Sequence, residues 1–169
     1  NQLKTYKPGM FHTWTDNKIF EHNGIESTKG AHWVGLFRML HKKRFDYFPM
    51  SILEAAREAK LYKQEYQLSI AVDPYILITY PVCFYFYVEK NNHELAQHLN
   101  QGFEKIIANG EFDKIFSKHH SGILKEFFTG SRKVIRLKNP LLPQSVPLER
   151  AELWLHYQYS DSRPTTLYK

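Results

Sequence analysis

The sequence has little cysteine and no long apolar run. A single cysteine, Cys83, excludes an intramolecular disulfide and a zinc site built from several cysteines. The most apolar stretch, residues 76–88, is interrupted by Thr79, Pro81 and several tyrosines. It is shorter than the roughly 20 residues that a membrane-spanning helix needs. We therefore expect neither a disulfide-stabilised fold nor a transmembrane segment.

Strong charge bias is missing as well. Hydrophobic residues make up 43% and charged residues 24% of the 169 residues, a balance typical of globular proteins. This length suits one domain or two small lobes. The net charge of +6 comes from short, scattered clusters such as residues 41–44 and 132–138. We expect a solvated surface and no nucleic-acid interface.

Turn residues and hydrophobic periodicity divide the first half of the chain into strands and helices. Strands are expected at residues 10–14, 25–27, 45–48, 66–71, 76–80 and 82–88. Helices are expected from residues 15–17 to 23–24, at 31–43 and at 52–60, with Ser51 as the N-cap of the last helix and Glu54 three residues later. Because strands that alternate with helices form parallel sheets, this order predicts an α/β fold with a mostly parallel sheet.

The second half of the sequence has a different pattern. Apolar residues at helical spacing predict one helix that ends at Asn109-Gly110 and another that runs from Phe112 to Phe127. Residues 134–137 are expected to form a lone strand, and residues 149–156 a helical turn. Three prolines in between oppose regular structure.

Five segments carry a resemblance to a known family. They are residues 12–17, 35–49, 80–90, 95–116 and 139–143. In this order they resemble the type 2 periplasmic solute-binding proteins, in particular the family 3 branch for polar amino acids and its uncharacterised subgroup. The resemblance covers roughly residues 9–155. It implies a lobe with a mostly parallel sheet and flanking helices, followed by C-terminal helices and an irregular tail.

The resemblance also implies a division of the chain. Residues 5–81 would form lobe 2, residues 82–128 a hinge strand and the C-terminal helices of lobe 1, and residues 129–169 an extended Pro-rich tail. A second hinge strand would lie near Leu3-Lys4. Most of lobe 1 has no counterpart here, so the apolar helix face at Leu95, Leu99, Phe103, Ile106 and Phe112 would be uncovered. The chain would then be a fragment, its helices would repack, or a partner such as a second copy would cover them.

The turn at Trp14, Thr15, Asp16 and Asn17 is the main candidate site. Ligands of α/β proteins bind at the carboxyl ends of strands, and the resemblance places this turn in the cleft between the lobes. Backbone N–H groups at a helix N-terminus, with the Thr15 hydroxyl and the Asn17 amide, would attract a carboxylate or phosphate. Asp16 would repel that anion unless it is engaged in capping. Equally, Thr15 or Asp16 would serve only as the N-cap.

Tyr47 and Ser51 complete the candidate site. In the family, an acidic residue after the third strand pairs with the ligand's ammonium group, and this position falls on Ser51. Serine cannot neutralise a cation, which argues against ordinary α-amino-acid binding. Trp14 and Tyr47 would wall the ligand or pack in the core. Asp46 is expected to have a structural role.

No motif for catalysis, a cofactor or a metal ion is legible. The sequence contains no phosphate-binding loop, nucleophile elbow or Ser-His-Asp pattern, and its nine histidines lack metal-ligand spacing. Cys83 is expected to be a buried packing thiol. We therefore expect no catalytic residue, no cofactor and no bound metal.

With no catalytic motif present, the resemblance implies a periplasmic, non-enzymatic protein that binds a small polar or anionic solute, such as an amino-acid-like one, in an inter-lobe cleft. Its partners would be that solute and an ABC-transporter permease or a sensor, and it would act in transport or sensing. One alternative is a dehydratase-like enzyme on the same scaffold, with Asp16 as the candidate acid or base. The other is a structural or interaction domain that has lost its ligand site.

Overall fold

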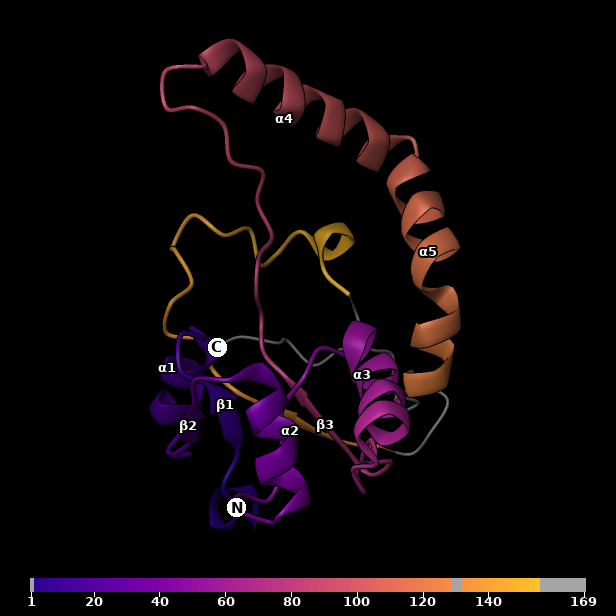
Figure 1. The fold of residues 1–169 in the computed structure, drawn as a ribbon. Helices are drawn as coiled ribbons and strands as arrows, with labels where there is room; N and C mark the ends of the chain where they lie inside the picture. The colour runs from indigo at the N-terminus through magenta and orange to yellow at the C-terminus, as the bar shows by residue number, and fades with distance from the viewer. Residues whose placement is uncertain (1, 129–131, 156–169) are drawn as a thin grey trace.

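A computed structural model describes residues 2–128 and 132–155 (Figure 1). Its elements, in chain order, are η1 (Gln2–Thr5), β1 (Gly9–Phe11), α1 (Asp16–His22), β2 (Thr28–Gly30), α2 (Trp33–His41), α3 (Ile52–Tyr66), β3 (Ile76–Thr79), α4 (His93–Ala108), α5 (Glu111–Phe128), β4 (Lys133–Arg136) and η2 (Ala151–Leu153). The mixed helices and short parallel strands confirm the α/β class at this coarse level. None of the described helices is long and apolar enough to span a bilayer.

The described strands form two small parallel sheets in place of the one sheet expected. β1 pairs with β2, and β3 pairs with β4. A single bridge between Pro8 and Tyr47 is all that forms of the strand predicted at residues 45–48. The approach is close here, because a Cβ on Gly9 would lie 2.1 Å from the ring of Phe45.

Three further strand predictions need correction. The second strand lies at Thr28–Gly30, after residues 25–27, because those three make no strand pairing. The strand predicted as lone is paired, since β4 lies in register with β3. The hinge strand expected near Leu3-Lys4 is wrong, because residues 2–5 form the short helix η1.

The strand predicted at residues 66–71 is also wrong, because α3 extends through Tyr66. Tyr62 stacks on Phe37 of α2 with ring centroids 3.9 Å apart, so continuing the helix buries a second aromatic surface. Gln67 then adopts a left-handed conformation, φ 52°, which ends the helix. Residues 67–73 have no regular structure.

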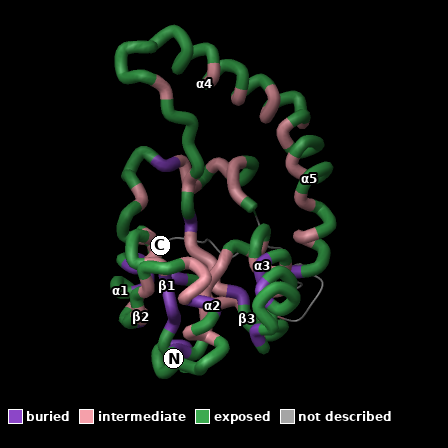
Figure 2. Tube along the Cα trace, viewed as in Figure 1, coloured by how far each residue is buried: buried purple, intermediate pink, exposed green. Residues whose placement is uncertain are grey.

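Two hydrophobic clusters hold what we call the compact part, residues 2–81 with residues 132–148. The first cluster contains Leu3, Met10, Ile19, Phe20, Ile25 and Leu137, and the second contains Phe37, Tyr62 and Leu68. Most buried residues lie in this part (Figure 2). Leu137 belongs to the segment predicted as a tail, so that segment begins inside the core.

Residues 82–128, which we call the outer arm, extend away from the compact part through α4 and return to it at the end of α5 (Figure 1). The helices α4 and α5 form as predicted, and Gly110 lies between them at φ 75°. Residues 82–88 do not form the predicted strand, because no neighbouring strand pairs with them in the described structure. Cys83 is therefore half-buried in an irregular segment. α4 has no buried residue, whereas α5 ends beside α3.

Candidate functional site

Asn17 fixes the shape of the turn between β1 and α1. Its side chain is buried, and its amide nitrogen donates hydrogen bonds of 2.9 Å to the carbonyl oxygens of Phe11 and Trp14. Its amide oxygen accepts a bond of 2.7 Å from the Ser27 hydroxyl. Both amide hydrogens of Asn17 therefore bond to backbone carbonyl groups of the protein. They fix the turn, which is braced in this sense, and they are not available to a ligand.

Asp16 connects this turn to the segment that follows β3. Its Oδ1 atom accepts a hydrogen bond of 2.5 Å from the hydroxyl of Tyr80. Burial raises the pKa of Tyr80, and the hydrogen bond to Asp16 together with its negative charge raises it further. Tyr80 thus remains a protonated donor, and the Asp16 carboxylate is engaged with a residue that the sequence analysis did not single out.

Thr15 presents polar atoms at the surface. It occupies the N-cap position of α1, but its hydroxyl makes no capping hydrogen bond. The backbone N–H groups of Thr15 and Asp16 also have no partner among the described residues. One turn therefore holds three donors that have no partner among the described residues. α1 has only seven residues, so we expect its dipole to contribute less to binding at this turn than hydrogen bonds from these three donors.

Trp14 joins the turn to an aromatic cluster. Its ring stacks on Phe48 at a centroid distance of 5.7 Å and meets Trp33 edge-on at 5.7 Å. Trp33 in turn contacts Phe37 at 5.5 Å. These contacts bring residues 14–17 and the segment around residue 48 together, and they leave Trp14 half-buried.

Tyr47 serves the core in the observed structure. Its ring packs against the first hydrophobic cluster, and its hydroxyl oxygen is buried with no partner among the described residues. Burial raises the pKa of Tyr47 to about 12, with a smaller contribution from the negative charge of Asp46. Asp46 has the structural role expected, since its Oδ2 atom accepts a bond of 2.6 Å from the Lys7 backbone N–H.

Ser51 caps α3. Its hydroxyl accepts a hydrogen bond of 3.3 Å from the backbone N–H of Leu53, as the sequence pattern predicted. The residue is exposed and lies three positions after Phe48, which stacks on Trp14. Of the six candidate site residues, Thr15 and Ser51 are exposed, Trp14, Asp16 and Tyr47 are half-buried, and Asn17 is buried.

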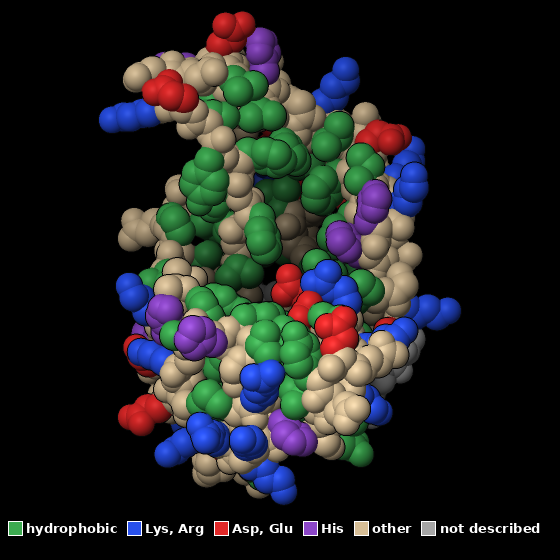
Figure 3. Space-filling view, in the orientation of Figure 1, with side chains coloured by type: hydrophobic (Ala, Val, Ile, Leu, Met, Phe, Trp, Pro, Cys, Tyr) green, Lys and Arg blue, Asp and Glu red, His purple; other side chains and the backbone are tan. Residues whose placement is uncertain are grey.

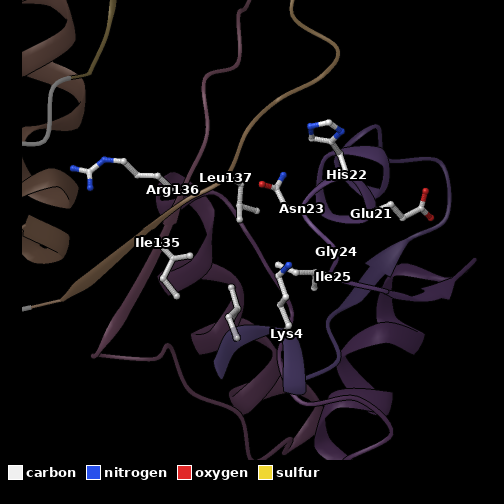
Figure 4. Close-up of a pocket in the computed structure, with 10 residues that line it drawn as sticks. Lys4, Glu21, His22, Asn23, Gly24, Ile25, Ile135, Arg136 and Leu137 are labelled. Atoms are coloured by element: carbon white, nitrogen blue, oxygen red, sulfur yellow. The ribbon is translucent and has the colours of Figure 1, made fainter. Parts of the chain in front are cut away.

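Two hollows in the described surface lie away from these residues. The first is lined by Leu3, Lys4, residues 21–25 and residues 135–137 (Figure 4). The second is lined by residues 81, 138–139, 142–144, 146 and 148. Arg136 extends away from Lys4 in the first hollow, and Glu21 pairs with Lys29 at 3.0 Å. None of the six candidate residues lines either hollow.

The described residues contain no group of three or more histidine, cysteine or acidic side chains that could hold a metal ion. No family model, curated protein or solved structure matches the chain. The resemblance to solute-binding proteins therefore rests on the residues themselves.

Proposed function

We propose that this chain is a non-enzymatic, extracytoplasmic solute-binding protein, and that the turn at residues 14–17 forms one side of its site for a small polar or anionic solute. The observation that carries the proposal is the set of three unpartnered donors on a braced turn, namely the Thr15 hydroxyl and the N–H groups of Thr15 and Asp16. The resemblance to periplasmic solute-binding proteins supports the same function.

The brace is what makes these donors suitable for binding. Asn17 and Ser27 hold the turn before a solute arrives, so little conformational entropy is lost on binding. Trp14 adds a half-buried aromatic surface beside the donors. A carboxylate or a neutral polar group fits such a set.

The charges near the turn narrow the class of solute. Asp16 carries a negative charge next to the donors, which disfavours a dianion such as phosphate and favours a neutral or singly charged solute. Ser51 offers no charge for an ammonium group. A small carboxylate without a free ammonium group therefore fits better than an α-amino acid, and delivery to a permease or sensor follows from the resemblance.

Thermal unfolding with added solutes tests this function. Acetate, lactate, glutamate and phosphate are compared with sodium chloride at equal ionic strength, and the first two are expected to raise the melting temperature most. A solute at 100 times its dissociation constant adds about 2.7 kcal/mol to the free energy of unfolding.

The matched variants are Thr15→Val, which removes the hydroxyl, and Thr15→Ser, which keeps it. Thr13→Val removes a neighbouring exposed hydroxyl and serves as the control. Stabilisation by the solute should be lost in Thr15→Val and kept in the other two. Equal responses in all three variants, or no solute that stabilises the protein, would contradict the proposal.

A further inference from the structure

Residues 82–88, with the sequence Val-Cys-Phe-Tyr-Phe-Tyr-Val, have the composition of a strand, and none of the described strands lies beside them. None of their backbone groups takes part in a backbone–backbone hydrogen bond among the described residues. Phe84 is 97% exposed and Tyr87 is 92% exposed. Seven consecutive β-forming residues with unpaired backbone are a template for strand addition.

The two faces of this segment differ in chemistry. Alternate residues of an extended chain share a face, so Val82, Phe84, Phe86 and Val88 form a wholly apolar face. Cys83, Tyr85 and Tyr87 form the other face, which carries two phenol hydroxyls. Phe86 contacts Phe103 of α4 at a centroid distance of 5.2 Å, so the apolar face meets α4 at this residue, whereas Phe84 stays exposed.

α4 supplies a cover for that face. It is sixteen residues long, contains Leu95, Leu99, Phe103 and Ile106, and buries none of them. Apolar side chains border much of the hollow between this helix, α5 and the compact part, and a group of charged side chains lies at its lower border (Figure 3). Antiparallel sheets commonly have one face covered by other elements and the other face exposed to solvent, and this segment would have helices on its apolar face and solvent on its tyrosine face.

The sequence of the segment is nearly symmetric about Tyr85. In an antiparallel pair with an identical segment centred on that residue, Val82 lies opposite Val88, Phe84 opposite Phe86, and Tyr85 opposite Tyr85. Aromatic and β-branched pairs of this kind stabilise sheets. No charged residue lies within the segment, so the pairing brings no like charges together. Pro81, which has no N–H, ends the ladder.

We propose that residues 82–88 pair with the same residues of a second copy of this chain, as antiparallel strands about a two-fold axis at Tyr85. The two α4 helices then lie on the shared apolar face, and the tyrosine hydroxyls face water. A second copy fits better than an unrelated strand, because only self-pairing uses the symmetry of the sequence.

Cysteine cross-linking in a Cys83→Ser background tests the register. Tyr85→Cys places two thiols opposite each other, where Cα atoms about 4.5–5.5 Å apart permit a disulfide. Val82→Cys places them six residues apart along the strands, about 20 Å, which prevents one. Tyr85→Cys alone should therefore give a covalent dimer on mild oxidation, and Val82→Cys alone should not.

Mixing Val82→Cys with Val88→Cys sharpens the test, since these two positions are opposite each other in the proposed register. The mixture should form a disulfide that neither variant forms by itself. Cross-linking of Val82→Cys alone, or none with Tyr85→Cys, would overturn the register and with it the proposal.

Light scattering then measures the mass of the protein with its native Cys83. A dimer is expected, and Phe84→Lys should convert it to a monomer without loss of the far-ultraviolet circular dichroism signal, because Phe84 makes no buried contact. Tyr75→Lys, at an aromatic residue that is 72% exposed outside the segment, should remain dimeric. A monomeric parent protein, including one that gains mass only with an unrelated partner, would refute the proposal. Neither result depends on solute binding.

Discussion

The compact part and the outer arm obey the same helix rules but differ in how their apolar residues are used. In the compact part, Met10, Phe20 and Leu36 are fully buried. In the arm, α4 has strong helix signals and a regular apolar face, yet it buries nothing. Local sequence thus specifies secondary structure in both regions, whereas most of the burial that contributes stability lies in the compact part.

The largest expected difference in stability between the two regions is between substitutions of two phenylalanines. Phe20→Ala removes a ring that is 0% exposed, and it should lower the free energy of unfolding by about 3–5 kcal/mol because it leaves a cavity. Phe84→Ala removes a ring that is 97% exposed and, at protein concentrations low enough to keep the chain monomeric, should change it by less than about 0.5 kcal/mol. Urea unfolding followed by circular dichroism measures both. Similar losses would mean that the arm is as tightly packed as the core.

A comparison of two asparagines is expected to give an intermediate difference in the free energy of unfolding. Asn17→Ala removes three hydrogen bonds, each worth about 0.5–1.5 kcal/mol, so a loss of about 2–3 kcal/mol is expected even though the carbonyl groups of Phe11 and Trp14 each keep a backbone N–H donor. Asn100→Ala, on exposed α4, replaces a residue with no side-chain hydrogen bond among the described residues and should favour the helix slightly. The same urea titration measures both, and a loss under about 1 kcal/mol for Asn17→Ala would show that the turn is not braced.

Tyrosine ionisation gives the smallest effect and depends on pH. The pKa of Tyr47 is about 12 in the folded protein and 10 in the unfolded chain. As the pH rises, the Tyr47 hydroxyl of the unfolded chain therefore loses its proton first. The contribution of Tyr47 to the free energy of unfolding is therefore constant below pH 10 and decreases between pH 10 and 12. Tyr47→Phe should make this fall shallower.

At neutral pH the same substitution should cost nothing or stabilise the protein by up to about 1 kcal/mol, since the buried hydroxyl has no partner among the described residues. Tyr87→Phe, in the arm and 92% exposed, should leave the pH profile unchanged. Thermal melts from pH 7 to pH 12 measure both variants, and identical alkaline profiles would mean that Tyr47 is accessible to water.

Features encoded within one turn of chain were predictable. The helix boundaries at Asn109-Gly110 and the Ser51 cap follow from local capping chemistry, and the structure confirms them. The strands at 66–71 and 82–88 were wrong for a different reason. A strand forms only where another backbone pairs with it, and neither segment has such a neighbour in the described structure.

The candidate site shows the same limit. Residues 14–17 could be grouped as a site because they are neighbours in the sequence. The buried, structural role of Asn17 could not be predicted, because it depends on a hydrogen bond from Ser27, which is ten residues away. The bond between Asp16 and Tyr80 joins positions 64 residues apart, and no local pattern marks either as a partner of the other. Side chains that act through tertiary contacts are therefore the part of the site that sequence reasoning missed.

The hydrogen bond from Tyr80 to Asp16 has one more consequence. Tyr80 is two residues before Val82, so a single phenol connects the turn proposed to bind a solute with the segment proposed to join two subunits. Thermodynamic linkage makes such a joint work in both directions. A solute that repositions Asp16 would change the affinity between subunits by the same factor by which association changes the affinity for solute, which would make this chain a concentration-dependent receptor.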